Sequence, residues 1–386
     1  MAGSLMGNAV PRVEDPDLVR GNGAYVDDIQ VDGVLHCAFV RSPMAHARFT
    51  IDDVEQAGAA AGVVGVYTAA DLDLPAGYQF FEVNAACARP PLAVGRVRFV
   101  GEPVAVVVAE TRAQAVDATE LVDVTYDPLP AVVDMEQALT PDAPQQFDEV
   151  AGNVVGGERE PDDAGDVLAD ATHVVRVRIE NPRLAVAPLE GNAVLVLPGR
   201  PEDEHELTAY LSTQMPHGAR SAIARTFGID TKRVRVVAPH VGGAFGGKAG
   251  LSVEHTVAIA VARRLGRPVK FVETRSEAML SMQGRGQVQY VELGLTEDGR
   301  FTGLRCRVVG DCGAYAGFGG TFAYSTTYIM ATGVYDIPAL DYAGVAALTN
   351  TAPVGAFRGA GRPEAAAMIE RVVDVAADEL GIDPVD

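Results

Sequence analysis

Residues 242–248, Gly-Gly-Ala-Phe-Gly-Gly-Lys, are the stretch of this chain whose composition could do chemistry. A run of β-branched residues over 234–237 predicts a buried strand in front of this loop. Apolar residues at helical spacing predict a helix over 252–265 behind it, ended by Gly266 and Pro268. A glycine loop between a strand and a helix lets a bulky ligand approach the backbone, and its N–H groups can point at anionic oxygens. The sequence therefore predicts a ligand-binding corner here.

Two plainer interpretations of the loop remain open. One is a nucleotide P-loop, whose first positions Gly242, Gly247 and Lys248 satisfy. A P-loop needs Ser or Thr next to hold Mg²⁺, but Ala249 stands there, so a P-loop NTPase is disfavoured. The other interpretation is a glycine turn that only connects the strand to the helix.

Two more segments stand out in front of predicted helices. Thr-Gln-Met-Pro-His at 213–217 includes Gln214 and leads into a helix predicted over 219–227, with Pro216 near its first turn. The second site-like stretch, 349–364, includes Arg358 and leads into a helix predicted over 364–380, which Gly381 ends. By contrast, His46 has no second histidine near it in sequence, and we expect a structural hydrogen-bonding role.

The pattern of elements predicts two domains and a linker. A strand over 103–109, a helix capped by Thr111 and a strand over 122–126 indicate a small α/β domain over 1–138. Residues 139–165 are dominated by Pro, Asp, Gly and Glu, and predict a linker with too little apolar content to pack as helix or sheet. Residues 166–386 are rich in predicted strands and form the second domain.

Composition limits the classes of function. The chain has 386 residues, enough for two or three domains, with 48% hydrophobic and 22% charged residues, as in globular proteins. Its net charge of −21 argues against nucleic-acid binding, which needs clustered Lys and Arg. The first residues show no secretory signal, and no apolar run is long enough to span a bilayer. We therefore expect a cytoplasmic protein with no membrane span.

The four cysteines, Cys37, Cys87, Cys306 and Cys312, form no Cys-x-x-Cys pair and no regular framework. We expect reduced thiols and no iron–sulfur site within this chain.

Together these segments resemble the large, molybdopterin-binding subunits of the molybdenum hydroxylases, the xanthine dehydrogenase, aldehyde oxidase and carbon monoxide dehydrogenase family. The resemblance rests on the loop at 242–248, on Thr-Gln-Met-Pro-His at 213–217, on Tyr-Val-Asp-Asp at 25–28, on Arg-Ser-Pro-Met-Ala-His-Ala at 41–47 and on the stretch around Arg358. It covers nearly all of 11–386 in family order. It implies an α+β fold, with a small N-terminal α/β hammerhead-like domain and then a mixed α+β molybdenum-cofactor-binding domain. The family's second cofactor domain is not found in the sequence, so the subunit looks truncated.

The resemblance also assigns roles to residues. Gln214 would donate a hydrogen bond to an oxo ligand of the molybdenum, and Arg358 would be the cationic group at the edge of the pterin or active site. The backbones of Phe245 and Gly246 would lie against the apical side of the metal. Three further glycines would allow that approach: Gly242, Gly243 and Gly247. The plainer alternatives are a surface Gln, a turn, and an Arg paired with a buried carboxylate; no protein residue is expected to ligate the metal.

The implied function is oxidation of an aldehyde or an N-heterocycle, with oxygen taken from water. The implied cofactor is a molybdenum–pterin in its cytosine dinucleotide form, with FAD and 2Fe–2S clusters on partner subunits. The implied assembly is a dimer of heterotrimers with a flavin-binding medium subunit and an iron–sulfur small subunit. The family's catalytic Glu lies in the missing C-terminal half, so we expect this chain to be unable to catalyse alone. A non-catalytic fragment or scaffold remains the alternative.

Departures from the family pattern narrow the substrate. Gly359 stands where carbon monoxide dehydrogenases have a copper-binding Cys, so a copper-bridged site is not expected. Ala249 stands where purine-oxidising members have Glu, and no Arg lies between Arg307 and Arg358. Xanthine is therefore disfavoured.

Overall fold

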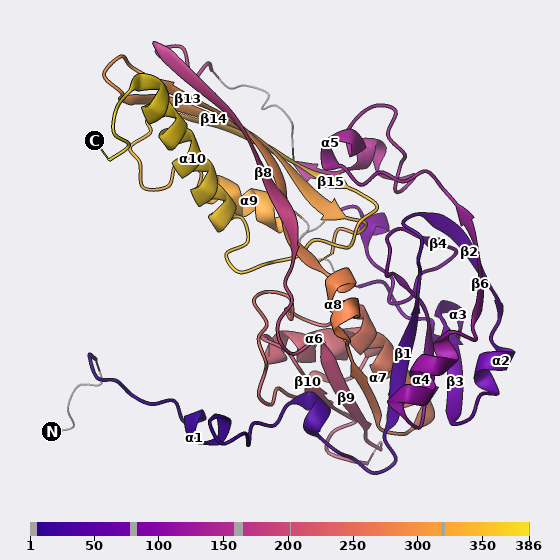
Figure 1. Cartoon of the computed structure of the whole chain (residues 1–386). Coiled ribbons are helices and arrows are strands. Elements are labelled where there is room, and N and C mark those ends of the chain that lie inside the picture. The colour runs from indigo at the N-terminus through magenta and orange to yellow at the C-terminus, as the bar shows by residue number, and fades with distance from the viewer. Residues whose placement is uncertain (1–5, 78–82, 158–164, 201, 318–320, 386) are drawn as a thin grey trace.

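A seven-stranded sheet forms the lower part of the molecule in Figure 1, in the order β11-β10-β9-β12-β1-β5-β3. The computed structural model describes residues 6–77, 83–157, 165–200, 202–317 and 321–385. The strands of this sheet are β1 Leu35–Arg41, β3 Val63–Thr68, β5 Pro103–Ala109, β9 Ala193–Pro198, β10 Leu207–Leu211, β11 Val234–Val237 and β12 Val269–Val272.

The sheet joins parts of the chain that are far apart in sequence. Strand β1 runs parallel to β12, with Leu35 opposite Val269. Strand β5 is buried along its whole length because β1 and β3 flank it and helices cover both faces of the sheet. Helix α7 (Val253–Leu265) packs on the face that carries Phe39, and α4 (Arg112–Thr119) packs on the face that carries Ala38. Strands from both sides of the predicted domain boundary near residue 138 therefore belong to one continuous sheet, and the boundary stays a prediction.

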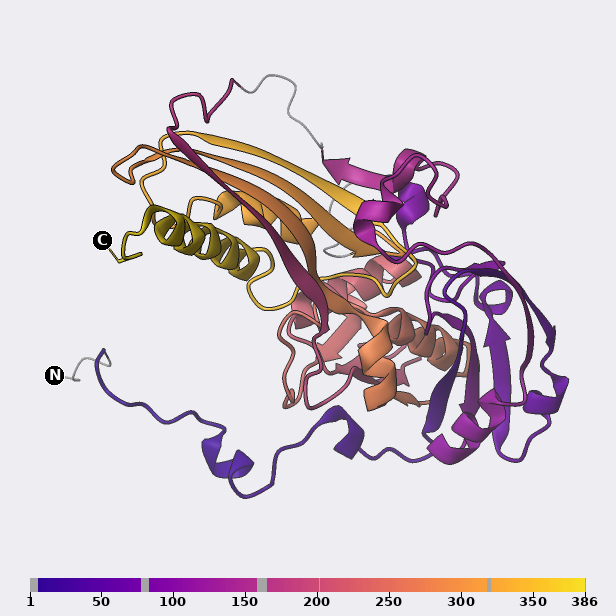
Figure 2. The same cartoon turned by 45° about the horizontal axis from the view of Figure 1, so that its top comes forward.

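A five-stranded sheet forms the upper part of the molecule, in the order β7-β15-β14-β13-β8 (Figures 1 and 2). Its strands are β7 Val154–Gly157, β8 His173–Ala185, β13 Gln283–Leu295, β14 Phe301–Gly313 and β15 Leu340–Leu348. The predicted hairpin is confirmed as β13 and β14. Helix α10 (Arg362–Leu380) covers one face, where Met368 is fully buried against the sheet.

A three-stranded sheet, β4-β2-β6, lies at the edge of the lower part, and short helices complete the fold. Its strands are β2 Ala47–Asp53, β4 Arg96–Val97 and β6 Asp123–Pro128. The remaining helices are α1 Asp15–Leu18, α2 Glu55–Gly58, α3 Ala69–Leu72, α5 Met135–Ala138, α6 Pro216–Phe227, α8 Arg275–Ser281 and α9 Phe322–Ile329, with 3₁₀ turns at Val26–Asp28, Ala85–Cys87, Ala151–Asn153 and Thr231–Arg233. The predicted α+β class is confirmed.

The prediction of an unpacked linker over 139–165 is wrong for its described part. Residues 154–157 form β7, which pairs with β15 at the edge of the upper sheet. Phe147 and Val150 are buried in a cluster with Tyr315, so a few apolar side chains suffice to pack this polar stretch. Residues 158–164 of the predicted linker lie outside the described residues.

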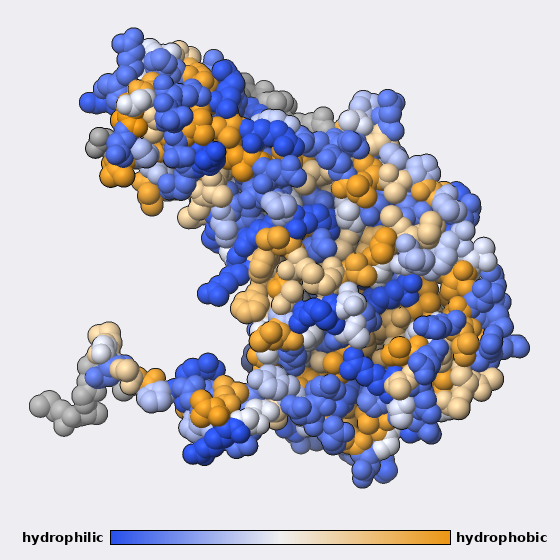
Figure 3. All heavy atoms as spheres, in the orientation of Figure 1, coloured by the Kyte–Doolittle hydropathy of each residue, from blue (hydrophilic) through white to orange (hydrophobic). Residues whose placement is uncertain are grey.

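An N-terminal arm, the described residues up to Ala24, carries α1 and reaches away from the body (Figures 1 and 3). Two backbone contacts fix its inner end, since Ala24 donates to His240 Nδ1 at 2.9 Å and His240 donates to the Ala24 carbonyl at 3.1 Å. Figure 3 also shows orange and tan residues in the middle of the molecule, beneath the lower end of β8. Among the described residues, no helix is both long and apolar enough to cross a bilayer.

Candidate functional site

The loop at 242–248 is closed at its base by a buried ion pair. Lys248 is 3% exposed, and its Nζ atom lies 3.0 Å from Glu190 Oε2 and 2.6 Å from Ser212 Oγ. The same Glu190 oxygen accepts the Gly242 N–H at 2.8 Å and the Ser212 hydroxyl proton at 2.7 Å. Burial lowers the pKa of Lys248, and the Glu190 carboxylate opposes that shift. One carboxylate oxygen therefore ties the two ends of the loop together.

This geometry counts against the P-loop interpretation. Lys248 points at Glu190 and away from solvent. The N–H groups of Gly242, Gly246 and Gly247 all donate to acceptors within the chain, whereas a phosphate-binding loop directs such groups at the ligand. The expectation that loop N–H groups point at an anionic ligand is wrong for these three residues.

Gln214 reaches the loop through its side chain. Its Oε1 atom accepts the Gly246 N–H at 2.9 Å, and its own backbone N–H donates to the Lys248 carbonyl at 3.2 Å. Because the amide oxygen faces Gly246, the Nε2 group faces away and keeps its two donors. Gln214 is exposed in this chain. Its Nε2 group can therefore donate to a ligand that lies beside Gly246.

Residues 355–361 lie directly against the loop. The Arg358 N–H donates to the Phe245 carbonyl at 2.8 Å. A Cβ atom on Gly246 would lie 2.1 Å from the Ala356 carbonyl oxygen, and Gly246 has a φ of +104°, so only glycine fits there. The Arg358 side chain is exposed, and its guanidinium makes no hydrogen bond or ion pair within the described part of the chain. It is therefore free to meet a ligand.

A second ion pair fixes the backbone that carries Arg358. Arg285 Nη1 lies 3.0 Å from Glu364 Oε2, and Arg285 Nη2 donates to the Arg358 carbonyl at 3.0 Å. The Arg285 guanidinium also stacks over the Phe357 ring, 4.8 Å from its centroid. Glu364 is 1% exposed and accepts the Gly361 N–H at 2.9 Å, which caps α10. Helix α10 and β13 thus hold the loop at 355–361 in place.

The other predicted glycines mainly serve close packing. A Cβ atom on Gly242 would lie 2.6 Å from Glu190 Cβ, and one on Gly247 would lie 3.1 Å from Val186 Cγ1. Gly243 has a φ of +96° and lies under the Phe245 ring. Phe245 itself has a φ of +50° and is 46% exposed. The structure brings all seven predicted site residues together, and their roles toward a cofactor stay predictions.

A cavity of about 390 Å³ adjoins this site. Gly247 and Lys248 of the loop line it, together with Ala249, which follows the loop, and Met215, the residue after Gln214. A ligand bound beside Gly246 would therefore lie next to this cavity, which could hold a second small molecule.

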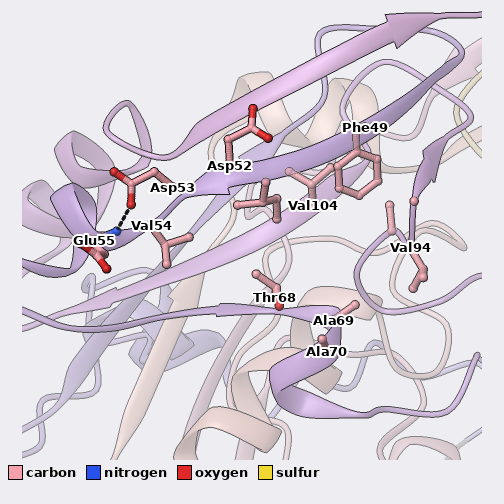
Figure 4. Close-up of a pocket in the computed structure, with 13 residues that line it drawn as sticks. Phe49, Asp52, Asp53, Val54, Glu55, Thr68, Ala69, Ala70, Val94 and Val104 are labelled. Carbon is pink, nitrogen blue, oxygen red and sulfur yellow. Dashed lines mark hydrogen bonds between the residues drawn. The ribbon is translucent and has the colours of Figure 1, made fainter.

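A different cavity, of about 500 Å³, lies between β2 and β3 in the N-terminal part (Figure 4). Two of its three carboxylates are already engaged: Asp53 accepts the Glu55 N–H at 2.7 Å, and Asp52 accepts the Thr50 hydroxyl at 2.7 Å. No residue of the loop at 242–248 lines this cavity, so we do not assign it to the site.

The remaining sequence expectations concern thiols and a histidine. The four cysteines are free, as predicted, and the structure also shows that they are buried. Burial raises the pKa of Cys37 to about 12. His46 Nδ1 lies 2.6 Å from the Pro130 carbonyl oxygen, which confirms the predicted structural role.

Sequence reasoning missed Glu190 and Arg285, which hold the two loops. Glu190 stands in an irregular connection, and Arg285 stands between Gly284 and Gly286 in a strand. The sequence offered one signal, and only for Arg285: glycines inside a strand, here Gly284 and Gly286, often mark a place where another part of the chain approaches closely.

Comparison with known proteins gives two matching family models. The aldehyde oxidase and xanthine dehydrogenase a/b hammerhead domain matches residues 20–130, and the molybdopterin cofactor-binding domain matches residues 146–386. These matches confirm the predicted order of a hammerhead domain followed by a cofactor-binding domain.

Individual relatives agree with the family models. The chain is 36% identical to the nicotine 6-hydroxylase large subunit of Paenarthrobacter nicotinovorans, over 99% of this chain and 47% of the relative. It is 37% identical to the carbon monoxide dehydrogenase large chain of Hydrogenophaga pseudoflava, over 96% of this chain and 48% of the relative. The crystal structure of quinoline 2-oxidoreductase from Pseudomonas putida 86 matches with a TM-score of 0.92 and 36% identity, over 98% of this chain and 49% of that one. The chain thus spans about half the length of each of these three relatives.

Proposed function

The chain belongs to the aldehyde oxidase and xanthine dehydrogenase family of molybdopterin-binding oxidoreductases, and we propose that it acts as the N-terminal part of a molybdenum hydroxylase large subunit. The observation that carries the proposal is the Gln214 side chain, whose oxygen is held by Gly246 and whose Nε2 group is left free to donate. An amide held in this way is a preorganised donor for a developing oxyanion.

The residues present fit the cofactor of this family. Gly246 packs directly against the Ala356 carbonyl, and this close approach holds the Phe245–Gly246 backbone beside the Gln214 amide and the Arg358 backbone. When bound, the molybdenum–pterin supplies two-electron oxidation with oxygen from water. Gln214 Nε2 would donate to an oxo oxygen of this group, and the Arg358 guanidinium would pair with an anionic edge of the pterin.

We propose an N-heterocycle or an aldehyde as the substrate class. Two relatives carry names of N-heterocycle oxidation, the nicotine 6-hydroxylase and the quinoline 2-oxidoreductase. Gly359 offers no thiol for copper, so carbon monoxide oxidation by a copper-bridged site is disfavoured. Ala249 lines the cavity where purine-oxidising members have Glu, which disfavours xanthine.

We propose that other chains complete the site. Gln214, Phe245 and Arg358 are all exposed in this chain, whereas an oxidation site works best when water is excluded. The C-terminal half of the large subunit would cover them and supply the catalytic Glu as general base.

The buried, dispersed cysteines favour an electron relay on partner subunits, a flavin-binding and an iron–sulfur one. The rest of the proposal is the cytosine dinucleotide form of the cofactor, a dimer of heterotrimers, a cytoplasmic location, and domain bounds of 1–138 and 166–386.

Two Gln214 variants test this proposal in the purified complex. Gln214→Glu keeps the acceptor for the Gly246 N–H but removes the Nε2 donors. We expect molybdenum content to stay near that of the wild type and kcat to fall by about a hundredfold or more, as for other lost oxyanion donors. Gln145→Glu, at an exposed position away from the loop, is the matched control. Unchanged kcat in Gln214→Glu, with full molybdenum, would refute the assigned role.

A further inference from the structure

The cavity between β2 and β3 lies where strand β4 stops short (Figure 4). Strand β4 has two residues, which pair with Ala47 and Arg48 at the start of β2. One more contact follows, from the Phe49 N–H to the Gly95 carbonyl at 3.1 Å. Residues 50–53 of β2 then continue for roughly 13 Å, and no strand of the described chain lies beside them on this side. We call the cavity along this free edge the β2 groove.

The free edge of β2 presents the backbone of Ile51 to the groove. In a strand, the N–H and C=O of one residue point to the same side, and the side alternates from one residue to the next. Because the Phe49 N–H points toward β4, the N–H and C=O of Ile51 point past the end of β4 into the groove. Thr50 points the other way, toward β6, where it pairs with Thr125. A strand edge of this kind is a template for an added strand.

The β2 groove is mostly apolar. Its apolar lining includes Phe49, Ile51, Val54, Ala93, Val94 and Val104. Val104 comes from β5 and is fully buried, whereas Val94 is 70% exposed. A side chain of an added strand that points to the same face as Ile51 would therefore contact apolar atoms.

The charge on the β2 groove is negative only. Asp52, Asp53 and Glu55 line it and are exposed, and no basic residue is among the described residues that line it. Asp52 accepts a neutral hydroxyl and Asp53 accepts a backbone N–H, so neither charge is neutralised. Since side chains alternate along a strand, Asp52 lies on the opposite face of β2 from Ile51. A strand beside β2 would therefore place one side chain on the apolar lining and the next one near a carboxylate.

We propose that the β2 groove binds an extended segment of a partner protein chain, which adds a strand to β2 where β4 ends. The backbone of this segment pairs with the N–H and C=O of Ile51. Its side chains alternate between apolar residues, which contact the groove lining, and Lys or Arg, which pair with the carboxylates. Such a segment uses the free strand edge, the apolar lining and the negative charge at once. The inference does not depend on the cofactor, because no residue of the loop at 242–248 lines the groove.

Binding of model peptides to the full chain tests the inference. The probe is acetyl-Thr-Lys-Val-Lys-Val-Thr-amide, and a second peptide has Glu in place of both lysines. We expect the basic peptide to have a Kd at least about tenfold lower by calorimetry, because opposite charges attract and like charges repel across an interface. A third peptide, N-methylated at both valines, keeps the charges but lacks the donors that face Ile51, and should bind at least about tenfold more weakly than the basic peptide. The basic peptide should also slow hydrogen exchange at the Ile51 N–H.

Charge variants of the groove give an independent measurement. Asp52→Lys combined with Glu55→Lys should weaken binding of the basic peptide at least about tenfold and make the acidic peptide the tighter ligand. The matched control is Asp378→Lys with Glu379→Lys, which makes the same change in net charge at exposed positions of α10 that do not line the groove. This control should leave both Kd values unchanged.

Equal Kd values for the basic and acidic peptides would overturn the inference, and so would a Kd that neither N-methylation nor the groove variants change. Slower exchange at Ile51 with rising concentration of the chain alone would assign the groove to a second copy and would also overturn it.

The natively purified complex, with all co-purifying chains retained, supplies the last comparison. We expect slower exchange at Ile51 than in the chain alone, and a carbodiimide cross-link from Asp52 or Glu55 to a lysine of a partner chain. Exchange as fast as in the chain alone, or a cross-link only to the C-terminal half of the large subunit, would contradict the proposal.

Discussion

Replacement of Lys248 by methionine tests how the site loop is held. Lys248 is 3% exposed, and its ammonium group lies 3.0 Å from Glu190. Methionine fills a similar volume but removes the charge and all donors. The Glu190 carboxylate would then stay largely buried with only the Gly242 N–H and the Ser212 hydroxyl as partners. Removal of one partner from a buried ion pair destabilises proteins by about 3–5 kcal/mol.

The structure narrows the expected loss of unfolding free energy in Lys248→Met. Glu190 keeps 15% of its side-chain exposure and two hydrogen bonds, so we expect a loss near the lower end, about 3 kcal/mol. The double variant Lys248→Met with Glu190→Gln should recover part of this loss, because both charges are then absent. Lys232→Met is the matched control, since Lys232 is exposed, and it should change stability by less than about 0.5 kcal/mol.

Urea unfolding of each variant, followed by near-UV circular dichroism, gives the free energies. A Lys248→Met variant within about 0.5 kcal/mol of the wild type would refute the reasoning. So would a double variant that is no more stable than the single one.

The other predictions concern close packing, pH and the N-terminal arm. Gly246→Ala should destabilise the fold more than Gly250→Ala, because both positions have positive φ but only Gly246 faces a carbonyl oxygen, 2.1 Å from an added Cβ; equal unfolding free energies would contradict this. His255 has a folded pKa of about 4 against an unfolded value of 6.5, so the unfolded state binds more protons in that window. Stability should therefore fall by about 3 kcal/mol as pH drops through it, and His255→Gln should flatten the slope of unfolding free energy against pH. Lys270→Met should loosen the segment that joins the N-terminal arm to β1, since Nζ donates to the Ile29 and Asp27 carbonyl groups at 2.7 and 2.9 Å, and limited proteolysis should then cut there faster than in wild type.

Local pattern predicted strands rich in β-branched residues, both inside a sheet, as for β5, and at a sheet edge, as for β8. The run in β5 and the alternation in β8 are strong signals, because β-branched residues suit buried strands. Strand β15, Leu-Asp-Tyr-Ala-Gly-Val-Ala-Ala-Leu, was missed because its alanines and glycine carry little strand preference. Strand β7, Val-Val-Gly-Gly, was missed because it is only four residues long, half of it is glycine, and polar residues surround it.

The candidate site was predictable as a set of segments but not as a geometry. Gln214, Gly246 and Arg358 were identified from motifs, and the structure brings them together. The groups that hold them were not predictable, because Glu190 and Arg285 act through contacts 52 to 79 residues away along the chain. Contacts of that range depend on tertiary packing, which local periodicity does not encode.

Metal analysis of the natively purified complex, with all co-purifying chains retained, tests the central claim most directly. We predict about one molybdenum per copy of this chain, a pterin cofactor and no stoichiometric copper. A complex that retains the C-terminal half of the large subunit and yet contains no molybdenum or pterin would contradict the account.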